Sequence, residues 1–498
     1  MLSPAPIYLL SNHSRCKMSS SPKEITIIGG GIIGCCTAYF LTRHPSYSPE
    51  THRITLLEAS NSNAGGRTPD SITDPATLAD PETASKRNPA HDGIAGGASG
   101  KAGGLLALWA FPRSIVPLSF KLHDELATEY GGDKRWGYRR CYASQIDCQA
   151  RLPPGFSSRM ADKKNIGEAE PVSNGAERVS KGLHKNHKKG IKELEKLGAP
   201  EDLDWLDIEE SLTAYEGMGT PDNTAQVHPE LFTRSMAQLA EEKGVKIVTG
   251  ARVTAINKTP DDKSVESVTY EKDGKEEILP TTDCVVAAGP WTPRLLPEIP
   301  INAARAHSVV IKTPKLVSAY ALFTSIMLPN GFPTPTPRDS RGAPGAQRPL
   351  RGQQIVEPEI YARPDGTAYA CGPTDDIVEL PLTAAEVEVD VARCEDIIYQ
   401  LGGISDELGK DGEVLAKQAC YLPQGGPYIG EVGPTKGLIV AAGHTCWGIQ
   451  NAPATGKLVS EIILDGKPKS AKLGGCDPSS KYVNIIGDDI VEARSFVY

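Results

Sequence analysis

The sequence contains no apolar run that approaches the ~18 residues needed to cross a bilayer as a helix. It also lacks an excess of positive charge, because its formal net charge at pH 7 is -9. These two absences argue against an integral membrane protein, a nucleic-acid partner and attraction to an anionic membrane surface. We therefore expect a soluble cytoplasmic protein, with peripheral association with endosomal membranes as the alternative. A chain of 498 residues is long enough for two domains.

Cysteine patterns typical of disulfide frameworks or zinc sites are missing too. The chain has 11 cysteines, which is an odd number, and no pair shows C-x-x-C spacing. Reduced thiols are therefore expected. His184 and His187 are spaced for one face of a charge-dense helix over residues 181–196, but no converging carboxylates or cysteines accompany them. We predict no metal site.

Neither end of the chain carries a convincing targeting signal. The apolar patch from Ile7 to Leu10 is too short for a signal-peptide core, and the final ARSFVY is not the peroxisomal S-K-L. Residues 1–23 are expected to form a disordered extension. The sequence leaves open whether Met1 or Met18 is the true start.

The most informative pattern begins with the β-branched run from Glu24 to Ile28, which predicts a buried parallel strand. Three glycines follow with G-x-G-x-x-G spacing, Gly29, Gly31 and Gly34, and a helix is expected directly after them. In a dinucleotide site these glycines allow a tight turn, a close approach to pyrophosphate, and packing of helix against strand. The helix N-terminus then favours phosphate. An ordinary glycine-rich turn is the alternative.

A second predicted strand, Arg53 to Leu57, ends at Glu58. An acid at this position accepts hydrogen bonds from ribose hydroxyls, and its charge repels a 2′-phosphate. The stretch therefore predicts FAD or NAD rather than NADP.

Further segments are assigned by periodicity and by turn residues. Helices are expected at 114–130, from 226 to 239 and up to 464. Strands are expected at 245–249, 251–256, 283–288, 359–361, 367–371 and 437–442, with an antiparallel pair around Asp273 and Gly274. Two stretches rich in Pro, Gly and polar residues, 61–92 and 329–353, are predicted to be mobile surface insertions.

The chain resembles the D-amino-acid oxidase and glycine oxidase superfamily of FAD-dependent oxidoreductases, most closely a fungal and plant branch. The resemblance runs from about Glu24 to Gly466. It rests on blocks in the family's order: IIGGGIIG with LLEAS, GGASGKAGG, AQVHPELF, VVAAGPWT, KQACYLPQGGPYIGEV and VAAGHTCWGIQNAPATGK.

This resemblance implies an α/β fold with two domains. A Rossmann-like FAD-binding domain with a parallel sheet of the glutathione-reductase type would combine residues 24–125, 226–296 and 430–470. A mixed-sheet α+β substrate domain would combine residues 126–225 and 297–429.

The resemblance also implies a set of FAD-binding residues. Backbone N–H groups near the start of the last helix would stabilise the reduced flavin as an oxyanion hole does. The set comprises Gly29, Gly31, Ile32, Ile33, Gly34 and Glu58 for pyrophosphate and ribose; Ser99, Gly100, Lys101 and Gly104 for pyrophosphate and flavin; Val253, Gly289 and Trp291 for the adenosine side; and Gly443, Gly448, Ile449 and Gln450 for the flavin edge.

The sequence departs from the family where substrate carboxylates are bound. Relatives carry an arginine just before the P-Y-I-G block, whereas this chain has Ala419 to Pro423. Sarcosine oxidases have a lysine near the position of Gln450. A plain amino-acid substrate is therefore in doubt, unless Arg363, Arg305 or Lys101 supplies the charge.

Cysteines and histidines in these blocks have two interpretations each. Cys420 lies in a region where some relatives attach FAD covalently, and non-covalent binding is favoured. Cys446 and the pair Cys35 and Cys36 are expected to be packing residues. His228 and His444 either act near substrate or form structural hydrogen bonds.

The predicted catalytic residues are His228, Arg363 and Gln450. We expect an enzyme that oxidises an amine, an amino-acid derivative or a similar small molecule by hydride transfer to FAD. A dehydrogenase with an acceptor other than oxygen, or a flavoprotein that serves mainly in binding or trafficking, is the alternative. The sequence does not give the oligomeric state.

Overall fold

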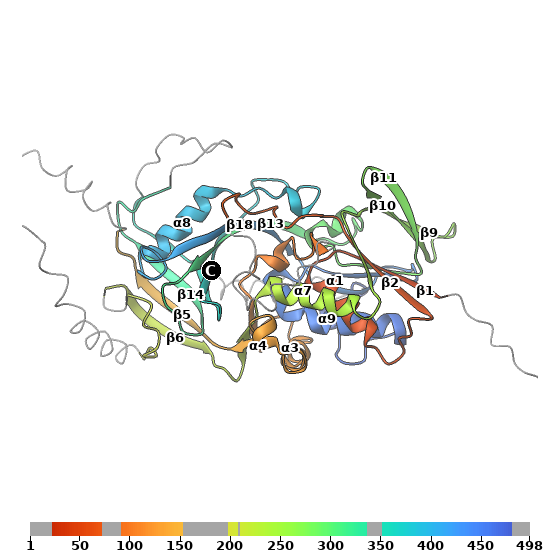
Figure 1. Ribbon diagram of the computed structural model, residues 1–498, viewed down its shortest axis with the longest axis horizontal. Coiled ribbons are helices and arrows are strands. Elements are labelled where there is room, and N and C mark those ends of the chain that lie inside the picture. Colours follow the sequence, from red (N-terminus) through yellow and green to blue (C-terminus); the bar gives the residue numbers. More distant parts are fainter. Residues whose placement is uncertain (1–21, 72–90, 153–197, 208–209, 336–350, 481–498) are drawn as a thin grey trace, which may run out of the picture.

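Two lobes lie side by side along the long axis of the computed structural model, which describes residues 22–71, 91–152, 198–207, 210–335 and 351–480 (Figure 1). The first lobe contains α1, α7 and α9, and the second contains α8 and the long strands β13, β14 and β18. The predicted helix at 181–196 and nearly all of the predicted N-terminal extension lie outside these ranges.

A six-stranded sheet forms the centre of the first lobe, in the order β19-β20-β12-β1-β2-β8. All neighbours are parallel except β19 and β20. The sequences of its inner strands are runs of apolar, often β-branched residues, because both faces of these strands are covered. The strands are β1 Lys23–Ile28, β2 His52–Glu58, β8 Lys246–Thr249, β12 Asp283–Val286, β19 Tyr428–Glu431 and β20 Leu438–Ala442.

One face of this sheet is covered by helices, which are α1 Ile32–Thr42, α3 Val116–Tyr130, α7 Pro229–Glu241 and α9 Gly448–Asp465. The other face packs against an antiparallel sheet of β9 Arg252–Lys258, β10 Val265–Lys272 and β11 Lys275–Pro280. The result is a three-layer lobe, in which the sheet edge at the carboxyl ends of the parallel strands remains available for a site.

The second lobe is built on a mixed sheet in the order β18-β13-β17-β16-β14-β5-β6, with β15 paired to β14. Strands β5 and β14 are parallel, and the other pairs are antiparallel. Helix α8, Val391–Gly402, packs against it. The strands are β5 Tyr142–Gln149, β6 Leu212–Gly219, β13 Asn302–Lys312, β14 Tyr320–Leu328, β15 Gln354–Val356, β16 Glu359–Ala362, β17 Thr367–Asp375 and β18 Glu413–Gln424.

Short elements connect the two lobes. A small sheet pairs β7, Thr224–Gln226, with β3, Leu105–Ala107, and β4, Arg139–Arg140. The remaining described elements are short helices of three to six residues: α4 Gly132–Arg135, η3 Ala98–Gly100, η4 Gly289–Arg294, η5 Ala384–Glu386, η6 Thr445–Trp447 and η7 Gly474–Cys476.

Both predicted insertions are partly built into the fold, which corrects the expectation for the residues that are described. In the first, Arg67 is buried and pairs with Glu230 of α7 at 2.7 Å. In the second, Phe332 is fully buried in the core of the second lobe. The expectation was based on the Pro, Gly and polar residues of these stretches, and it overlooked single residues in them that are buried against the rest of the protein. Residues 72–90 and 336–350 lie outside the described ranges.

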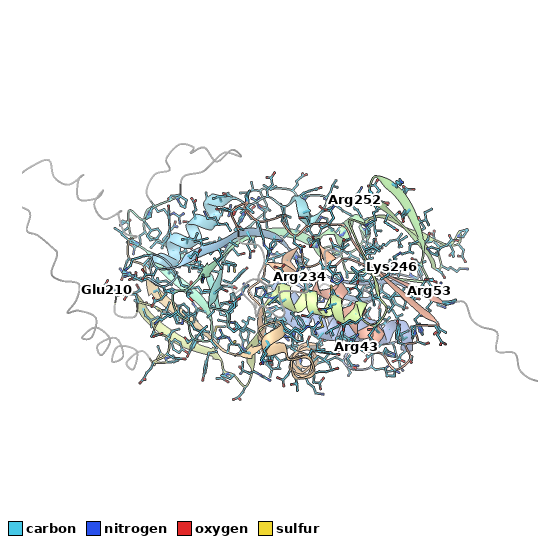
Figure 2. All side chains as sticks on the ribbon, in the orientation of Figure 1. Arg43, Arg53, Glu210, Arg234, Lys246 and Arg252 are labelled. Atoms are coloured by element: carbon cyan, nitrogen blue, oxygen red, sulfur yellow. The ribbon has the colours of Figure 1, made fainter. Side chains whose placement is uncertain are left out.

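Charged side chains project from the surface of both lobes, as Figure 2 shows for Arg53 and Arg252 of the first lobe and Glu210 of the second. The described cysteines are free thiols, and all of them are buried except Cys371 and Cys446. Among the residues that the structure describes, no helix has the length and hydropathy required to cross a membrane.

Candidate functional site

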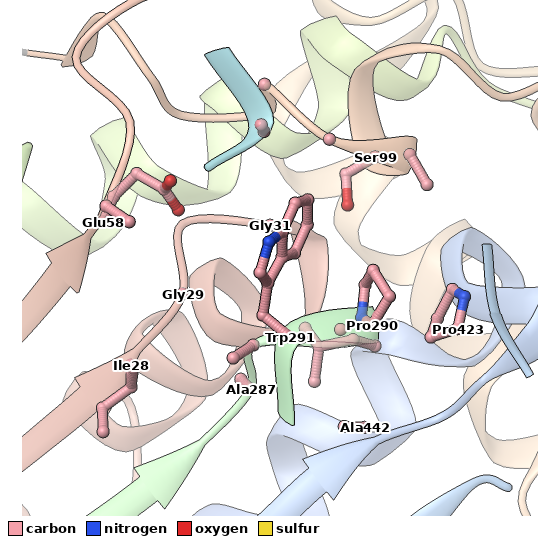
Figure 3. Close-up of a pocket in the computed structure, with 18 of the residues that line it drawn as sticks. Ile28, Gly29, Gly31, Glu58, Ser99, Ala287, Pro290, Trp291, Pro423 and Ala442 are labelled. Carbon is pink, nitrogen blue, oxygen red and sulfur yellow. The ribbon is translucent and has the colours of Figure 1, made fainter. Parts of the chain in front are cut away.

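A cavity of about 300 Å³ lies where four parallel strands end (Figure 3). It is lined by residues that end or directly follow β1, β2, β12 and β20: Ile28 and Gly29, Leu57 and Glu58, Ala287 to Gly289, and Ala441 to Gly443. Ligands of open α/β sheets bind at this carboxyl edge. Segments near the two ends of the described chain thus meet in one site.

The glycine turn after β1 has two packing glycines and one that faces the cavity. Gly29 has φ +114, and a Cβ there would lie 2.4 Å from the carbonyl oxygen of Ala287. A Cβ on Gly34 would lie 2.0 Å from the oxygen of Gly29. A Cβ on Gly31 would meet only Ser99 Oγ, at 3.0 Å, and would project into the cavity. The turn therefore leaves space for a ligand at Gly31.

Glu58 presents its carboxylate to the cavity from the end of β2 (Figure 3). The backbone N–H of Gly30 donates to Oε2 at 2.6 Å, and that of Ser60 donates to Oε1 at 2.8 Å. Burial raises the pKa of Glu58, although hydrogen bonds from Ser60 and Gly30 oppose this rise. Its position is therefore fixed by the turn, and further lone pairs are available to ligand hydroxyls.

Two helix N-termini border the same cavity. Ile32 and Ile33 belong to the first turn of α1, and Gly448 and Ile449 begin α9. Neither first turn contains an acidic residue. The partial positive charge of both helix ends favours a negatively charged ligand.

The start of α9 is held by buried hydrogen bonds. Gln450 Oε1 accepts from the N–H of Ala107 at 2.8 Å, and Asn451 Nδ2 donates to the oxygen of Phe111 at 2.6 Å. His444 Nε2 lies 3.0 Å from Thr455 Oγ1. Burial lowers the pKa of His444 to about 3, so this ring is neutral at physiological pH.

A loop of the second lobe closes over the cavity. Trp291 Nε1 donates to the oxygen of Pro381 at 2.7 Å, and Arg294 Nη1 donates to the same oxygen at 3.0 Å. This anchoring brings residues 382–384 into the cavity wall. Sequence reasoning missed the loop because no local pattern links it to the glycine turn.

Most of the predicted FAD residues line the cavity: Gly29, Gly31, Ile32, Ile33, Glu58, Ser99, Val253, Gly289, Trp291, Gly443, Gly448 and Ile449. Gly34, Gly100, Lys101, Gly104 and Gln450 are not among the lining residues. Gly100 and Gly104 instead allow close backbone packing, since a Cβ would lie 2.2 Å from the oxygen of Ala95 and 2.0 Å from that of Val227, respectively.

Lys101 lies behind the cavity wall and is buried. Its Nζ donates to the oxygen of Gly96. Burial, with the charge of Arg67, lowers its pKa to about 8. Burial raises the pKa of the nearby Cys420 to about 11, and Cys420 is not a lining residue.

His228 and Arg363 are brought together, and neither is a lining residue, although Arg363 contacts the lining residue Ala102. Arg363 Nη1 lies 3.4 Å from His228 Nε2, and Arg363 Nη2 donates to the oxygen of Ala102 at 3.1 Å. Burial, followed by the charge of Arg363, lowers the pKa of His228 well below its usual value. Their catalytic roles, and that of Gln450, stay predictions.

Cys446 does not have the predicted packing role, because it is exposed and lines the cavity. Cys35 and Cys36 are buried, as expected. Within the described ranges, no group of three or more His, Cys, Asp or Glu side chains is arranged to hold a metal ion.

The cavity residues fit an extended dinucleotide. The carboxylate of Glu58 suits hydroxyl groups, and the turn at Gly31 leaves room for a ligand beside the N-terminus of α1. At the other side, Gly443, Gly448 and Ile449 place backbone without bulky polar side chains against the cavity.

Comparisons with known proteins agree with this geometry. The family model described as "FAD dependent oxidoreductase" matches residues 90–462, and one described as "NAD(P)-binding Rossmann-like domain" matches residues 27–80. The chain is 33% identical to the Saccharomyces cerevisiae protein named "Putative oxidoreductase TDA3", over 93% of this chain and 95% of that one. A Schizosaccharomyces pombe protein named "Putative oxidoreductase C1F5.03c" is 30% identical, over 92% of this chain and 98% of that one.

Solved structures share the fold at low sequence identity. Glycine oxidase from Bacillus cereus has a TM-score of 0.55 and 18% identity, covering 90% of this chain and 96% of that one. L-proline dehydrogenase from P. horikoshii has a TM-score of 0.53 and 17% identity, with coverage of 92% and 97%.

Proposed function

Because the chain belongs to the FAD-dependent oxidoreductase family, we propose that it oxidises a small amine, an amino-acid derivative or a similar molecule at a carbon next to nitrogen. One observation carries the proposal. The glycine turn of the first βαβ unit and the start of α9 line the same cavity. Bound FAD supplies the hydride acceptor.

We assign the cavity residues to parts of FAD by their chemistry. Glu58 accepts hydrogen bonds from ribose hydroxyls, and Gly31 with the N-terminus of α1 receives the pyrophosphate. Val253 and Trp291 border the adenosine side. Gly443, Gly448 and Ile449 present backbone N–H groups to the flavin edge, where a fixed positive potential favours added electrons.

The proposal also concerns the electron acceptor that reoxidises the flavin. The solved structures with this fold include one named as an oxidase and one named as a dehydrogenase. Since fold does not determine function, we place oxidation by oxygen first and another acceptor second.

Anaerobic reduction of the bound flavin tests the proposal. Primary, secondary and tertiary amines and N-alkylated amino acids are added to the holoenzyme while absorbance near the flavin maximum is followed. We expect at least one amine to bleach the flavin, and peroxide to form once air is admitted. Bleaching without peroxide would favour a dehydrogenase. If no compound bleached the flavin, a binding or trafficking role would replace the proposal.

We further propose that FAD is bound non-covalently. Cys420 is buried outside the cavity wall, and its raised pKa keeps the thiol protonated and weakly nucleophilic. Acid precipitation is expected to release all of the flavin into the supernatant. Flavin that stays with the pellet in the wild type, but not in Cys420→Ser, would contradict this assignment.

A further inference from the structure

None of the three cations suggested for a substrate carboxylate lines the cavity. Arg305 Nη2 pairs with Asp375 at 3.1 Å, and Lys101 donates to Gly96. Arg363 differs from these two, because it donates to the oxygen of the lining residue Ala102, and its buried Nε has no hydrogen-bond partner among the described residues.

A carboxylate in the mixed sheet of the second lobe has no such counter-ion within the described ranges. Glu359, at the start of β16, accepts hydrogen bonds at Oε2 from the hydroxyl of Tyr361 and from the thiol of Cys371, whose Sγ lies 3.9 Å away. No Lys, Arg or His in the part of the chain that the structure describes forms an ion pair with Glu359. It is a partly buried acid that lacks a counter-cation.

Aromatic side chains gather beside this carboxylate. Phe323 of β14 is the cross-strand partner of Glu359. The ring of Trp109 lies 6.2 Å from that of Phe323 and 5.6 Å from that of Trp447. All three aromatic residues and Glu359 keep part of their surface accessible, so a ligand can reach them.

Cys446 connects this group to the cavity. It lines the cavity in η6, next to Trp447. Although part of Cys446 is exposed toward the cavity, desolvation by the surrounding protein, followed by the charge of Glu359, raises the pKa of its thiol to about 11. Through Trp447, whose ring lies 5.6 Å from that of Trp109, the aromatic side chains adjoin a residue of the cavity wall. We call Glu359, Trp109, Phe323, Cys446 and Trp447 the Glu359 cluster.

We propose that Glu359 determines substrate specificity: its carboxylate binds the protonated nitrogen of the substrate, which releases its proton to solvent before the carbon next to it is oxidised, and the aromatic rings of the Glu359 cluster surround the alkyl groups on that nitrogen. A carboxylate without a counter-ion gains a charge-assisted contact, and aromatic faces attract cations. The inference rests on the proposed function and narrows its substrates to cationic amines.

Binding of matched probes to the holoenzyme tests the inference by calorimetry. Benzyltrimethylammonium supplies an aromatic cation and benzoate an aromatic anion, both at the same ionic strength. We expect the wild type to bind the cation at least about tenfold more tightly than benzoate. Tighter binding of benzoate would overturn the inference.

Three variants separate charge from packing. Glu359→Gln keeps an acceptor for Tyr361 but removes the charge, and we expect the affinity for the cation to fall about tenfold. Glu359→Asp keeps the charge and is expected to retain most of the affinity. Glu276→Gln, on exposed β11, is the matched control and should bind like the wild type. Unchanged affinity in a flavin-loaded Glu359→Gln variant would overturn the inference.

A second measurement covers the case in which Glu359→Gln does not fold. In the wild type, benzyltrimethylammonium should slow alkylation of Cys446, read by peptide mass spectrometry, whereas benzoate should not. Equal rates with and without the cation would contradict the assignment. If amines bleached the flavin equally well in the wild type and in Glu359→Gln, the proposed function would stand and only the inference would be overturned. If the cation bound in a Glu359-dependent way but no amine bleached the flavin, Glu359 would remain a cation site and the proposed function would be overturned.

Discussion

Glu58 both stabilises the fold and faces the ligand cavity. Its carboxylate accepts backbone N–H groups of Gly30 and Ser60 and also lines the cavity. In Glu58→Gln, one oxygen becomes an NH₂ donor that faces a backbone donor. We expect FAD affinity of the apoprotein to fall about tenfold, measured by quenching of flavin fluorescence. The surface variant Glu276→Gln should bind FAD as the wild type does, and equal affinity in both variants would exclude a ribose contact.

Single residues differ in how far the sequence could predict them. Glu58 and the three glycines were predictable because they belong to one βαβ unit, in which their spacing is itself the signal. The setting of Glu359 was not predictable, since its cross-strand partner Phe323, and the rings of Trp109 and Trp447 that follow beside Phe323, come from distant parts of the chain. Cys446 was misassigned because the sequence does not show which side of the turn faces the cavity.

At the scale of elements, the close approach of α1 and α9 positions both helix N-termini. A Cβ on Gly456 of α9 would lie 2.5 Å from the carbonyl carbon of Cys36 in α1. Gly456→Ala must therefore separate the helices, and we expect it to lower the free energy of unfolding by roughly 1–3 kcal/mol. Gly217→Ala in β6 is the matched control, because a Cβ there meets nothing within 4 Å. Equal stability of the two variants, measured by denaturant unfolding, would show that α1 and α9 are not closely packed.

Elements of the first lobe were predicted well because each has a strong local signal. Strands β1, β2, β12 and β20 and helices α1, α3, α7 and α9 are confirmed within a few residues of the expected ranges. In the second lobe β13, β18 and α8 were missed. Helix α8 carries one usable signal, its N-cap Asp390, whose side chain accepts from the N–H of Ala392 at 3.0 Å. The long strands β13 and β18 are defined mainly by pairing with each other, which sequence alone does not reveal.

For the whole molecule, the buried histidines predict acid sensitivity. Burial lowers the pKa values of His123 and His307 to about 4 and that of His444 to about 3. Between these values and the ordinary pKa near 6.5, the unfolded chain binds more protons than the folded one. Stability is therefore complete above about pH 6.5 and falls as the pH is lowered, by up to roughly 1.4 kcal/mol per pH unit for each histidine.

Denaturant unfolding from pH 7.5 to pH 5 measures this dependence. His444→Asn removes one titrating ring and should flatten the slope relative to the wild type. A free energy of unfolding that stays constant or rises as the pH falls would contradict the neutral state of these histidines.

At the scale of the whole molecule, three stretches that are distant in the sequence meet in one sheet. The domain limits at 24–125, 226–296 and 430–470 stay a proposal, but the six-stranded sheet brings these three stretches together. Their shared carboxyl edge forms the cavity. Local patterns predict each stretch, and only the family resemblance predicts that they converge.

The dissociation constant of FAD from the apoprotein tests this convergence most directly. Gly31→Ala and Gly448→Ala each place a methyl group in the cavity wall, one at the glycine turn and one at the start of α9. We predict that each weakens FAD binding about tenfold or more, whereas Gly217→Ala leaves it unchanged. A wild-type protein that takes up no FAD, or a loss of affinity in only one of the two cavity variants, would contradict a single FAD held by both segments.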